Sequence, residues 1–174
     1  MVFAPKWQLA LTLLRQVRSA GFTVTAVVGD AEFGDNATLR RVLHRAKLPY
    51  ALGVSSDLKV FLGTPVLEAP APLTGKGRPR TRRLLPPETQ TIEARAWAAT
   101  QTPRRWRLVS WRNGTQAAWR ARFCAVRVTP AHDWRAERRL APEVWLLCER
   151  GSRTSSDSIL SKAAACRDGN AMSS

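Results

Sequence analysis

The chain has few cysteines, and their arrangement excludes common zinc and disulfide frameworks. Among its 174 residues are three cysteines, Cys124, Cys148 and Cys166. Their number is odd, and no CxxC or Cys/His pair has the spacing of a zinc site. This pattern favours a reducing compartment, in which Cys124 and Cys148 act as small buried hydrophobic residues.

Long apolar runs are also absent. Residues 1–10 contain no hydrophobic segment typical of a secretory signal peptide, and no apolar run reaches the length of about 18 residues that suggests a membrane span. We therefore expect a cytoplasmic protein without membrane contact.

Motifs of two common enzyme classes are missing as well. The serines form no nucleophile elbow, and residues 75–77 do not belong to a GxxxxGK[ST] phosphate-binding loop.

Negative charge is scarce. Lys and Arg number 28 and Asp and Glu 13, which gives a formal net charge of +15. A compact chain with this imbalance repels itself unless a polyanion neutralises it. Nucleic acid is the usual polyanion, and its binding should weaken steeply as salt rises. The alternative is a basic surface that has no specific partner.

The first third of the sequence alternates between helix and strand patterns. Apolar residues at helical spacing predict a helix over 6–20, begun by Pro5 and ended by Gly21. A β-branched apolar run predicts a buried strand over 23–29, which ends at Asp30.

A second helix and a second strand follow. Gly34, Asp35 and Asn36 are expected to form a turn and a helix cap, residues 39–46 carry an apolar stripe, and residues 50–54 predict a strand. A strand, a crossover helix and another strand form a parallel unit with a right-handed connection. The fold class of this part is therefore α/β.

The middle and last thirds differ from this pattern. Residues 55–87 are rich in Pro, Gly and Arg and predict an exposed loop, with a basic segment at 74–83. A short helix is expected within 92–99. The predicted antiparallel strands are 105–111, with a hairpin signal at Asn113-Gly114, then 120–129 and 142–149. Residues 151–174 are expected to be a disordered tail.

Five tryptophans gather in the antiparallel part: Trp106, Trp111, Trp119, Trp134 and Trp145. Between arginines they could stack on nucleic-acid bases. The other interpretation, which we favour, is that they fill a small β core.

Asp30 is the best-placed catalytic candidate. A carboxylate at the carboxyl end of a strand lies where α/β folds bind ligands, and it can hold Mg²⁺ together with substrate phosphates. A turn or capping role would explain the same position. Glu32 and Asp35 are close in sequence, but Asp35 is better explained as a cap or turn residue. His44 and His132 have no partner at a recognisable spacing, and we expect structural or surface roles for both.

The sequence resembles the DDE-type insertion-sequence transposases in six segments that occur in the same order. They are Val2-Phe3-Ala4-Pro5-Lys6, Val27 to Asn36 (VVGDAEFGDN), Leu48 to Val54 (LPYALGV), Trp106 to Gly114 (WRLVSWRNG), and Arg122 to His132 (RFCAVRVTPAH) followed by Glu143-Val144-Trp145-Leu146-Leu147. The resemblance covers roughly residues 1–150.

This resemblance implies a ribonuclease-H-like catalytic core with a β-rich insertion between its second and third catalytic acids. Asp30 occupies the second acid, within an Asp-x-x-(Tyr/Phe)-Gly pattern, and would be a catalytic metal ligand for Mg²⁺. The implied division is a partial core at 1–54, an insertion at 55–150 and the tail at 151–174. The basic loop would contact transposon-end DNA through Lys76, Arg78, Arg80, Arg82 and Arg83.

Two departures from the family pattern bear on activity. The strand with the first acid would precede Met1, and the helix with the third acid is not found after the insertion. We therefore expect a truncated transposase that does not cut DNA alone and is located at the nucleoid. The alternative is a non-enzymatic basic DNA-binding module, with association with an intact transposase as a further role. A third alternative is a chain that folds poorly.

Overall fold

The computed structural model describes residues 4–69, 83–113, 118–131, 140–150 and 162–167. Its helices are α1 (Lys6–Ser19), α2 (Ala31–Gly34), α3 (Ala37–Arg45) and α4 (Ala94–Ala99), with a short 3-10 helix η1 (Pro103–Arg105). Its strands are β1 (Val27–Gly29), β2 (Tyr50–Val54), β3 (Lys59–Leu62), β4 (Ile92–Glu93), β5 (Arg107–Asn113), β6 (Ala118–Pro130), β7 (Val144–Arg150) and β8 (Lys162–Arg167).

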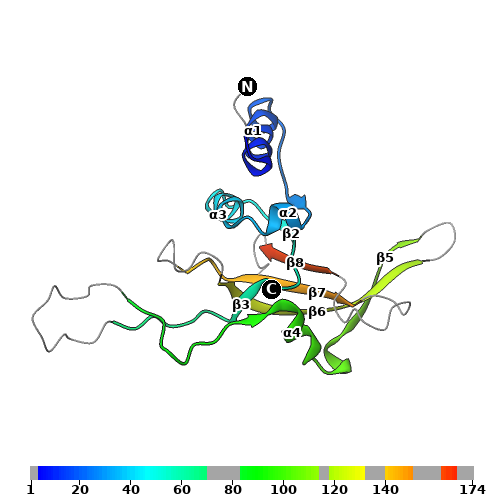
Figure 1. Cartoon of the computed structure of the whole chain (residues 1–174). Coiled ribbons are helices and arrows are strands. Elements are labelled where there is room, and N and C mark those ends of the chain that lie inside the picture. The colour runs from blue at the N-terminus through cyan, green and yellow to red at the C-terminus, as the bar shows by residue number, and fades with distance from the viewer. Residues whose placement is uncertain (1–3, 70–82, 114–117, 132–139, 151–161, 168–174) are drawn as a thin grey trace, which may run out of the picture.

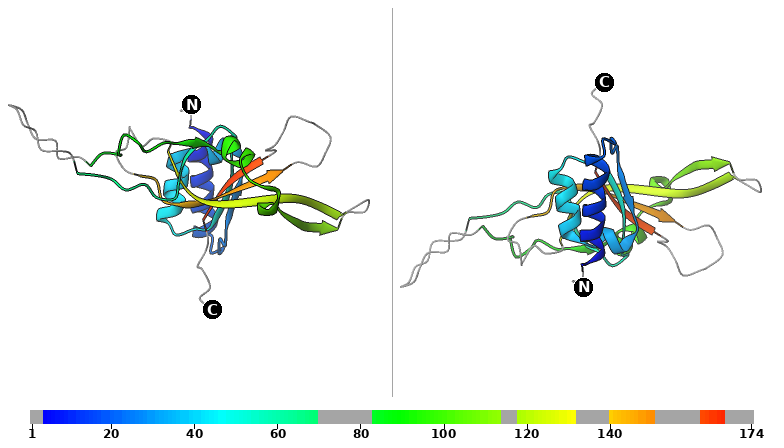
Figure 2. Two further views of the ribbon diagram at one scale, coloured as in Figure 1. Left: turned by 90° about the horizontal axis from the view of Figure 1, so that it is seen from below. Right: turned by 90° about the horizontal axis from the view of Figure 1, so that it is seen from above.

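All eight strands belong to one mostly antiparallel sheet. Its order is β1-β2-β8-β7-β6-β3-β4, and β5 pairs with β6 outside this path. Only β1 and β2 form a parallel pair of named strands, joined through α2 and α3. In Figure 1, α1 and α3 lie above the sheet and α4 lies below it. Figure 2 shows α1 and α3 side by side on their face of the sheet. The mixed α/β character expected from the sequence is confirmed.

Local sequence signals explain how the first elements begin and end. Pro5 precedes α1, and Gly21 follows its end at a φ of 86°, a left-handed conformation that glycine adopts without strain. The side chain of Asn36 accepts a hydrogen bond of 2.8 Å from the backbone N–H of Leu39 and so caps α3. The predicted helix starts and stops in this part of the chain are confirmed.

The core lies between the helices and the sheet. Its most deeply buried large side chains include Leu43 of α3, Leu52 of β2 and Leu146 of β7. Cys124 and Cys148 are free thiols that lie directly opposite each other on β6 and β7, and both are buried as expected. Burial raises the pKa of both thiols, that of Cys148 to about 12.

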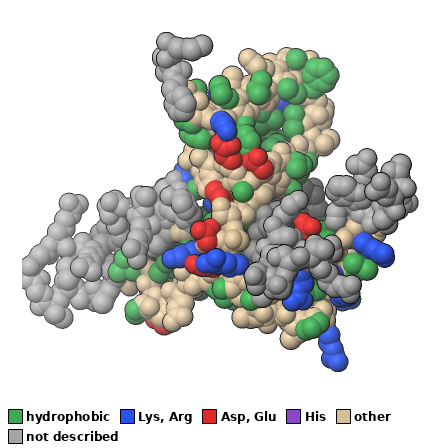
Figure 3. Space-filling view, turned by 45° about the vertical axis from the view of Figure 1, so that its right-hand side comes forward, with side chains coloured by type: hydrophobic (Ala, Val, Ile, Leu, Met, Phe, Trp, Pro, Cys, Tyr) green, Lys and Arg blue, Asp and Glu red, His purple; other side chains and the backbone are tan. Residues whose placement is uncertain are grey.

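The packed face of α1 differs from the stripe that the sequence suggests. Leu9, Leu13 and Val17 are 51%, 61% and 42% exposed, whereas Leu11 is buried. Hydrophobic side chains accordingly gather over the α1 end of the molecule in Figure 3. Apolar spacing located the helix correctly, and Leu14 packs against the core, but the rest of the spaced apolar residues do not mark the face that meets the core.

Four expectations for local structure are corrected. The strand before Asp30 is short and not buried, because β1 is an edge strand in which Val28 is 80% exposed. Gly34, expected in the turn at 34–36, is the last residue of helix α2, and β3 lies in the stretch predicted to be a loop. Residues 162–167, expected within a disordered tail, form β8, which hydrogen-bonds to β2 and β7.

The sheet runs through both the proposed core and the proposed insertion, and the division at residue 54 remains a prediction. The hairpin signal at Asn113-Gly114 is followed by the expected antiparallel pairing of β5 with β6. Gly114 itself lies outside the described residues. Among the described helices, none is long and apolar enough to cross a membrane.

Candidate active-site segment around Asp30

Asp30 lies between β1 and α2 and caps the helix. Its backbone is extended, and its Oδ1 accepts a hydrogen bond of 3.1 Å from the N–H of Glu32. The residue is exposed, and among the described groups no hydrogen bond involves Oδ2. The two interpretations of this position are therefore compatible, because one oxygen caps the helix while the other faces solvent and can take a ligand.

Two glycines fix the position of Asp30 relative to the sheet. A Cβ added to Gly34 would overlap the carbonyl oxygen of Gly53 and lie 2.7 Å from its carbonyl carbon. A Cβ added to Gly53 would lie 2.9 Å from the nitrogen of Ala31 and 3.0 Å from the carbonyl carbon of Asp30. The backbones of α2 and β2 are thus in direct contact, which only glycine permits at these two positions.

The aromatic residue of the Asp-x-x-Phe-Gly pattern anchors the same helix. Phe33 is half-buried and packs against the core cluster. At the C-terminal end of α2, the carbonyl of Gly34 accepts a hydrogen bond from the guanidinium of Arg40, which is only 5% exposed. The pattern therefore has a structural meaning: Asp30 caps α2, Phe33 anchors it, and Gly34 allows it to touch β2.

The neighbouring carboxylates are engaged in other interactions. Glu32 forms an ion pair of 2.8 Å with Lys6 of α1, in which both side chains are exposed. The hydrogen bond and the charge of Glu32 raise the pKa of Lys6, and the charge of Asp30 adds to this effect. Lys6 was not predicted to belong to this site. It is 26 residues from Glu32 in sequence, and no local spacing connects them.

Asp35 has the structural role that the sequence suggests. Its Oδ1 accepts a hydrogen bond of 2.8 Å from the N–H of Ser55, and its Oδ2 accepts another from the Ser55 hydroxyl. These bonds tie the end of α2 to the residue that follows β2. Asp35 therefore has both oxygens occupied and is not a second free ligand beside Asp30.

The described residues do not fit a complete two-ion metal site. Among them, no group of three or more His, Cys, Asp or Glu side chains is placed to hold a metal ion. Asp30 offers one uncommitted carboxylate oxygen, Glu32 faces an ammonium group and Asp35 is bound to Ser55. A Mg²⁺ ion with one carboxylate would depend on phosphate oxygens and water for its remaining ligands.

The basic residues predicted to bind DNA are only partly described. Lys76, Arg78, Arg80 and Arg82 lie outside the described residues, whereas Arg83 is exposed. Arg83 precedes Leu84, which forms an isolated antiparallel bridge with Glu68. The two chain segments that lead into the basic loop are thus held together at this bridge.

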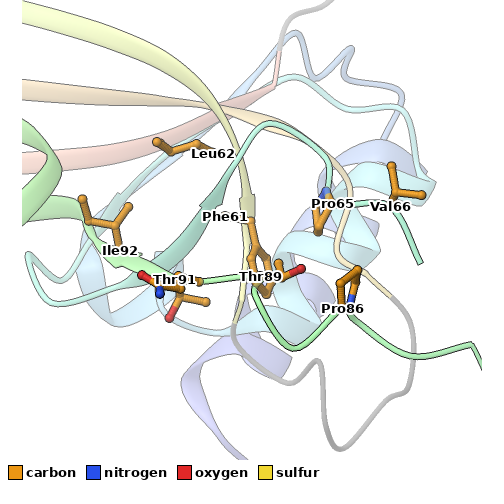
Figure 4. A pocket seen from close by; sticks show the side chains of 9 residues that line it. Phe61, Leu62, Pro65, Val66, Pro86, Thr89, Thr91 and Ile92 are labelled. Atoms are coloured by element: carbon orange, nitrogen blue, oxygen red, sulfur yellow. The ribbon is translucent and has the colours of Figure 1, made fainter. Parts of the chain in front are cut away.

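A cavity of about 490 Å³ lies between this bridge and the sheet. Figure 4 shows its lining side chains, which come from β3, from residues 65–66 and from residues 86–92. They are apolar or neutral, for example Phe61, Pro86 and Thr89, and include no acid, base or thiol. This cavity therefore has no group for proton transfer or metal binding, which leaves Asp30 as the better catalytic candidate.

The histidines do not add to the site. His44 is half-buried on α3. His132 lies outside the described residues. The structural or surface role expected for each histidine remains a prediction.

Comparison with known proteins identifies the family of this segment. Residues 1–118 match the family model described as DDE superfamily endonuclease, and this range includes Asp30, Phe33 and Gly34. Comparison with curated proteins and with solved structures gave no match. The matched range covers more than half of the chain. The chain therefore belongs to the DDE superfamily endonucleases.

Proposed function

We propose that the protein is a transposase-derived DNA-binding chain that contributes Asp30 to a catalytic site for DNA cleavage. The observation that carries this proposal is the geometry of Asp30, which follows β1 within the family match and keeps one carboxylate oxygen free. The parent reaction would be Mg²⁺-dependent cleavage and strand transfer at insertion-sequence ends. Asp30 would be one of the acids that bind the metal.

The parallel β1-α3-β2 unit supports a ribonuclease-H-like core within 1–54. Asp30 lies at the carboxyl end of β1, the end at which open α/β sheets bind ligands. The antiparallel strands after residue 54 would then be the β-rich insertion. In this proposal the DNA lies against both parts and neutralises the net charge of +15.

We also propose that this chain does not cleave DNA by itself. Two metal ions need several carboxylate ligands, and in the described part of the chain Glu32 and Asp35 are committed to Lys6 and Ser55. Further acids would have to come from outside the described residues, for example from another chain such as an intact transposase.

A nicking assay on supercoiled DNA with Mg²⁺ tests this proposal. The purified protein should bind the DNA but leave it uncut. Robust cleavage that is abolished by Asp30→Ala would refute the proposed inactivity. Asp30→Asn is the matched control, because asparagine retains the capping oxygen but removes the charge that a metal ligand needs.

The second candidate function is a non-enzymatic DNA-binding module. The excess of positive charge favours it, because charge alone is enough for binding. Mn²⁺ electron paramagnetic resonance in the presence of uncut DNA separates the two functions. Metal binding that is lost in Asp30→Asn supports a catalytic remnant. Identical spectra for the wild-type protein and Asp30→Asn, with unchanged DNA affinity, support the binding module.

A further inference from the structure

The β5–β6 ribbon carries exposed arginines that do not belong to the basic segment at 74–83. Figures 1 and 2 show this ribbon extending beyond the body of the sheet. Arg120 and Arg122 on β6 are exposed, and the residue between them, Ala121, is buried. Because side chains alternate along a strand, Arg120 and Arg122 project from the same face.

Strand register places a third arginine on that face. Arg122 of β6 lies directly opposite Arg150 of β7. Like charges directly opposite each other on antiparallel strands destabilise a sheet. The next pair on this face is Cys124 and Cys148, which are buried, so the arginines lie where the face passes from the core to solvent.

The contacts of these arginines do not neutralise their charge. The Arg150 guanidinium lies over the Trp106 ring at 5.3 Å, a cation–π contact that orients the group but leaves it cationic. Within the described part of the chain, neither Arg120 nor Arg122 forms an ion pair with a carboxylate. The face is therefore suited to an anionic partner.

An exposed apolar side chain lies among these charges. Leu108 of β5 is 59% exposed and lies opposite Arg122, and Val109 beside it is 41% exposed. A two-stranded ribbon fits the major groove of B-DNA, where apolar side chains contact thymine methyl groups and arginines contact phosphates or guanine. Both the charge and the exposed leucine match such a groove.

We propose that Arg120, Arg122 and Arg150 form a second DNA-binding surface, separate from the basic loop at 74–83, which holds the backbone of duplex DNA against the β5–β6 ribbon. This inference rests on the proposed DNA-binding function and assigns part of it to named residues. The Arg122–Arg150 juxtaposition carries the argument, because bound phosphate converts a repulsive pair into a bridged one.

Salt-dependent binding provides the test. Fluorescence anisotropy would measure the affinity for a labelled duplex of mixed sequence over a range of NaCl concentrations. The double variant Arg120→Gln/Arg122→Gln should make the slope of log K against log[salt] less steep by about 1.8, since each phosphate contact contributes about 0.9. The control Arg15→Gln/Arg18→Gln removes the same charge from exposed positions on α1 and should leave the slope near the wild-type value.

The outcomes separate this inference from the proposed function. A wild-type slope in the Arg120/Arg122 variant would overturn the ribbon surface while leaving DNA binding intact. An equal reduction in the α1 control would also overturn it, because the effect would then follow from net charge alone. A wild-type protein that shows no salt-dependent binding to duplex DNA would overturn both. Tighter binding to polyglutamate, an acidic polypeptide, than to duplex DNA would overturn the choice of partner.

Thermal denaturation adds a readout that needs no DNA. Inorganic phosphate should raise the Tm of the wild-type protein more than that of Arg122→Gln, because the variant no longer places two cations opposite each other. Without phosphate, Arg122→Gln should melt no lower than the wild type. A lower Tm for Arg122→Gln in phosphate-free buffer would contradict the claim that this pair is repulsive.

Discussion

Replacing Gly34 by alanine should destabilise the protein, because α2 touches β2 through backbone atoms alone. The new Cβ would overlap the Gly53 carbonyl oxygen and lie 3.1 Å from the Cβ of Leu52. Since the main obstacle is backbone and cannot rotate away, α2 must move. Overpacking of this kind costs about 1–3 kcal/mol, and weakening the bond from Arg40 to the Gly34 carbonyl adds about 1 kcal/mol.

One effect of this substitution opposes the loss. Gly34 is helical, and alanine is preferred over glycine in helices by about 1 kcal/mol. The net loss in the free energy of unfolding is then about 1–3 kcal/mol. In a chain of this size, each kcal/mol lowers the Tm by about 2–4 °C. Urea unfolding followed by circular dichroism would measure the change in free energy. A Gly34→Ala variant as stable as the wild type would refute the close contact.

Gly21→Ala is the matched control for this experiment. Gly21 has a φ of 86°, and no atom lies within 4 Å of an added Cβ. Its substitution should cost about 1–2 kcal/mol through backbone strain alone. In Gly34→Ala the movement of α2 should also displace Asp30, because Asp30 caps this helix. Metal binding should therefore weaken in Gly34→Ala and stay unchanged in Gly21→Ala.

Two further predictions concern stability and thiol chemistry. Asp30→Ala should lower the free energy of unfolding by about 1 kcal/mol, while Asp30→Asn should leave it nearly unchanged, because only asparagine keeps the cap; equal losses in urea unfolding would contradict the capping role. With the pKa of Cys148 raised by burial to about 12, Cys124 and Cys148 should resist iodoacetamide in the folded protein and react once urea unfolds it, as peptide mapping by mass spectrometry would show. Because the folded pKa of Cys148 exceeds the ordinary 9.0, the stability that this neutral thiol contributes is complete below about pH 9 and is lost as pH rises towards 12. Rapid alkylation of the folded protein would contradict this account.

Local signals predicted the elements whose ends are set by their own residues. α1, α3 and β2 follow from Pro5, Gly21, Asn36 and the alternation in 50–54, and all three were found within a few residues of their expected bounds. Asp30 was chosen as the catalytic candidate by its place after a strand and by its resemblance to the family pattern, and its catalytic role remains a prediction.

Long-range contacts explain what the sequence did not predict. Half of the residues of β8 are alanine, which has little intrinsic preference for strand; β8 is held by hydrogen bonds to β7, the strand before it, and to β2, which is far away in the chain. The Gly34–Gly53 contact and the Lys6–Glu32 ion pair also join distant positions. Spacing rules do not register such pairs, so the partners of Glu32 and Asp35 appear only in the fold.

The position of β8 has a consequence for how the protein is made. During synthesis, β2 is complete long before residues 162–167 leave the ribosome and β7 only shortly before, and until then each has an edge without its partner. The helical half and the antiparallel half can form early, but the sheet becomes continuous only when this late segment inserts between them. A nascent chain that pauses before Arg167 would present two open strand edges to chaperones, or to a neighbouring chain that could supply the missing strand in trans.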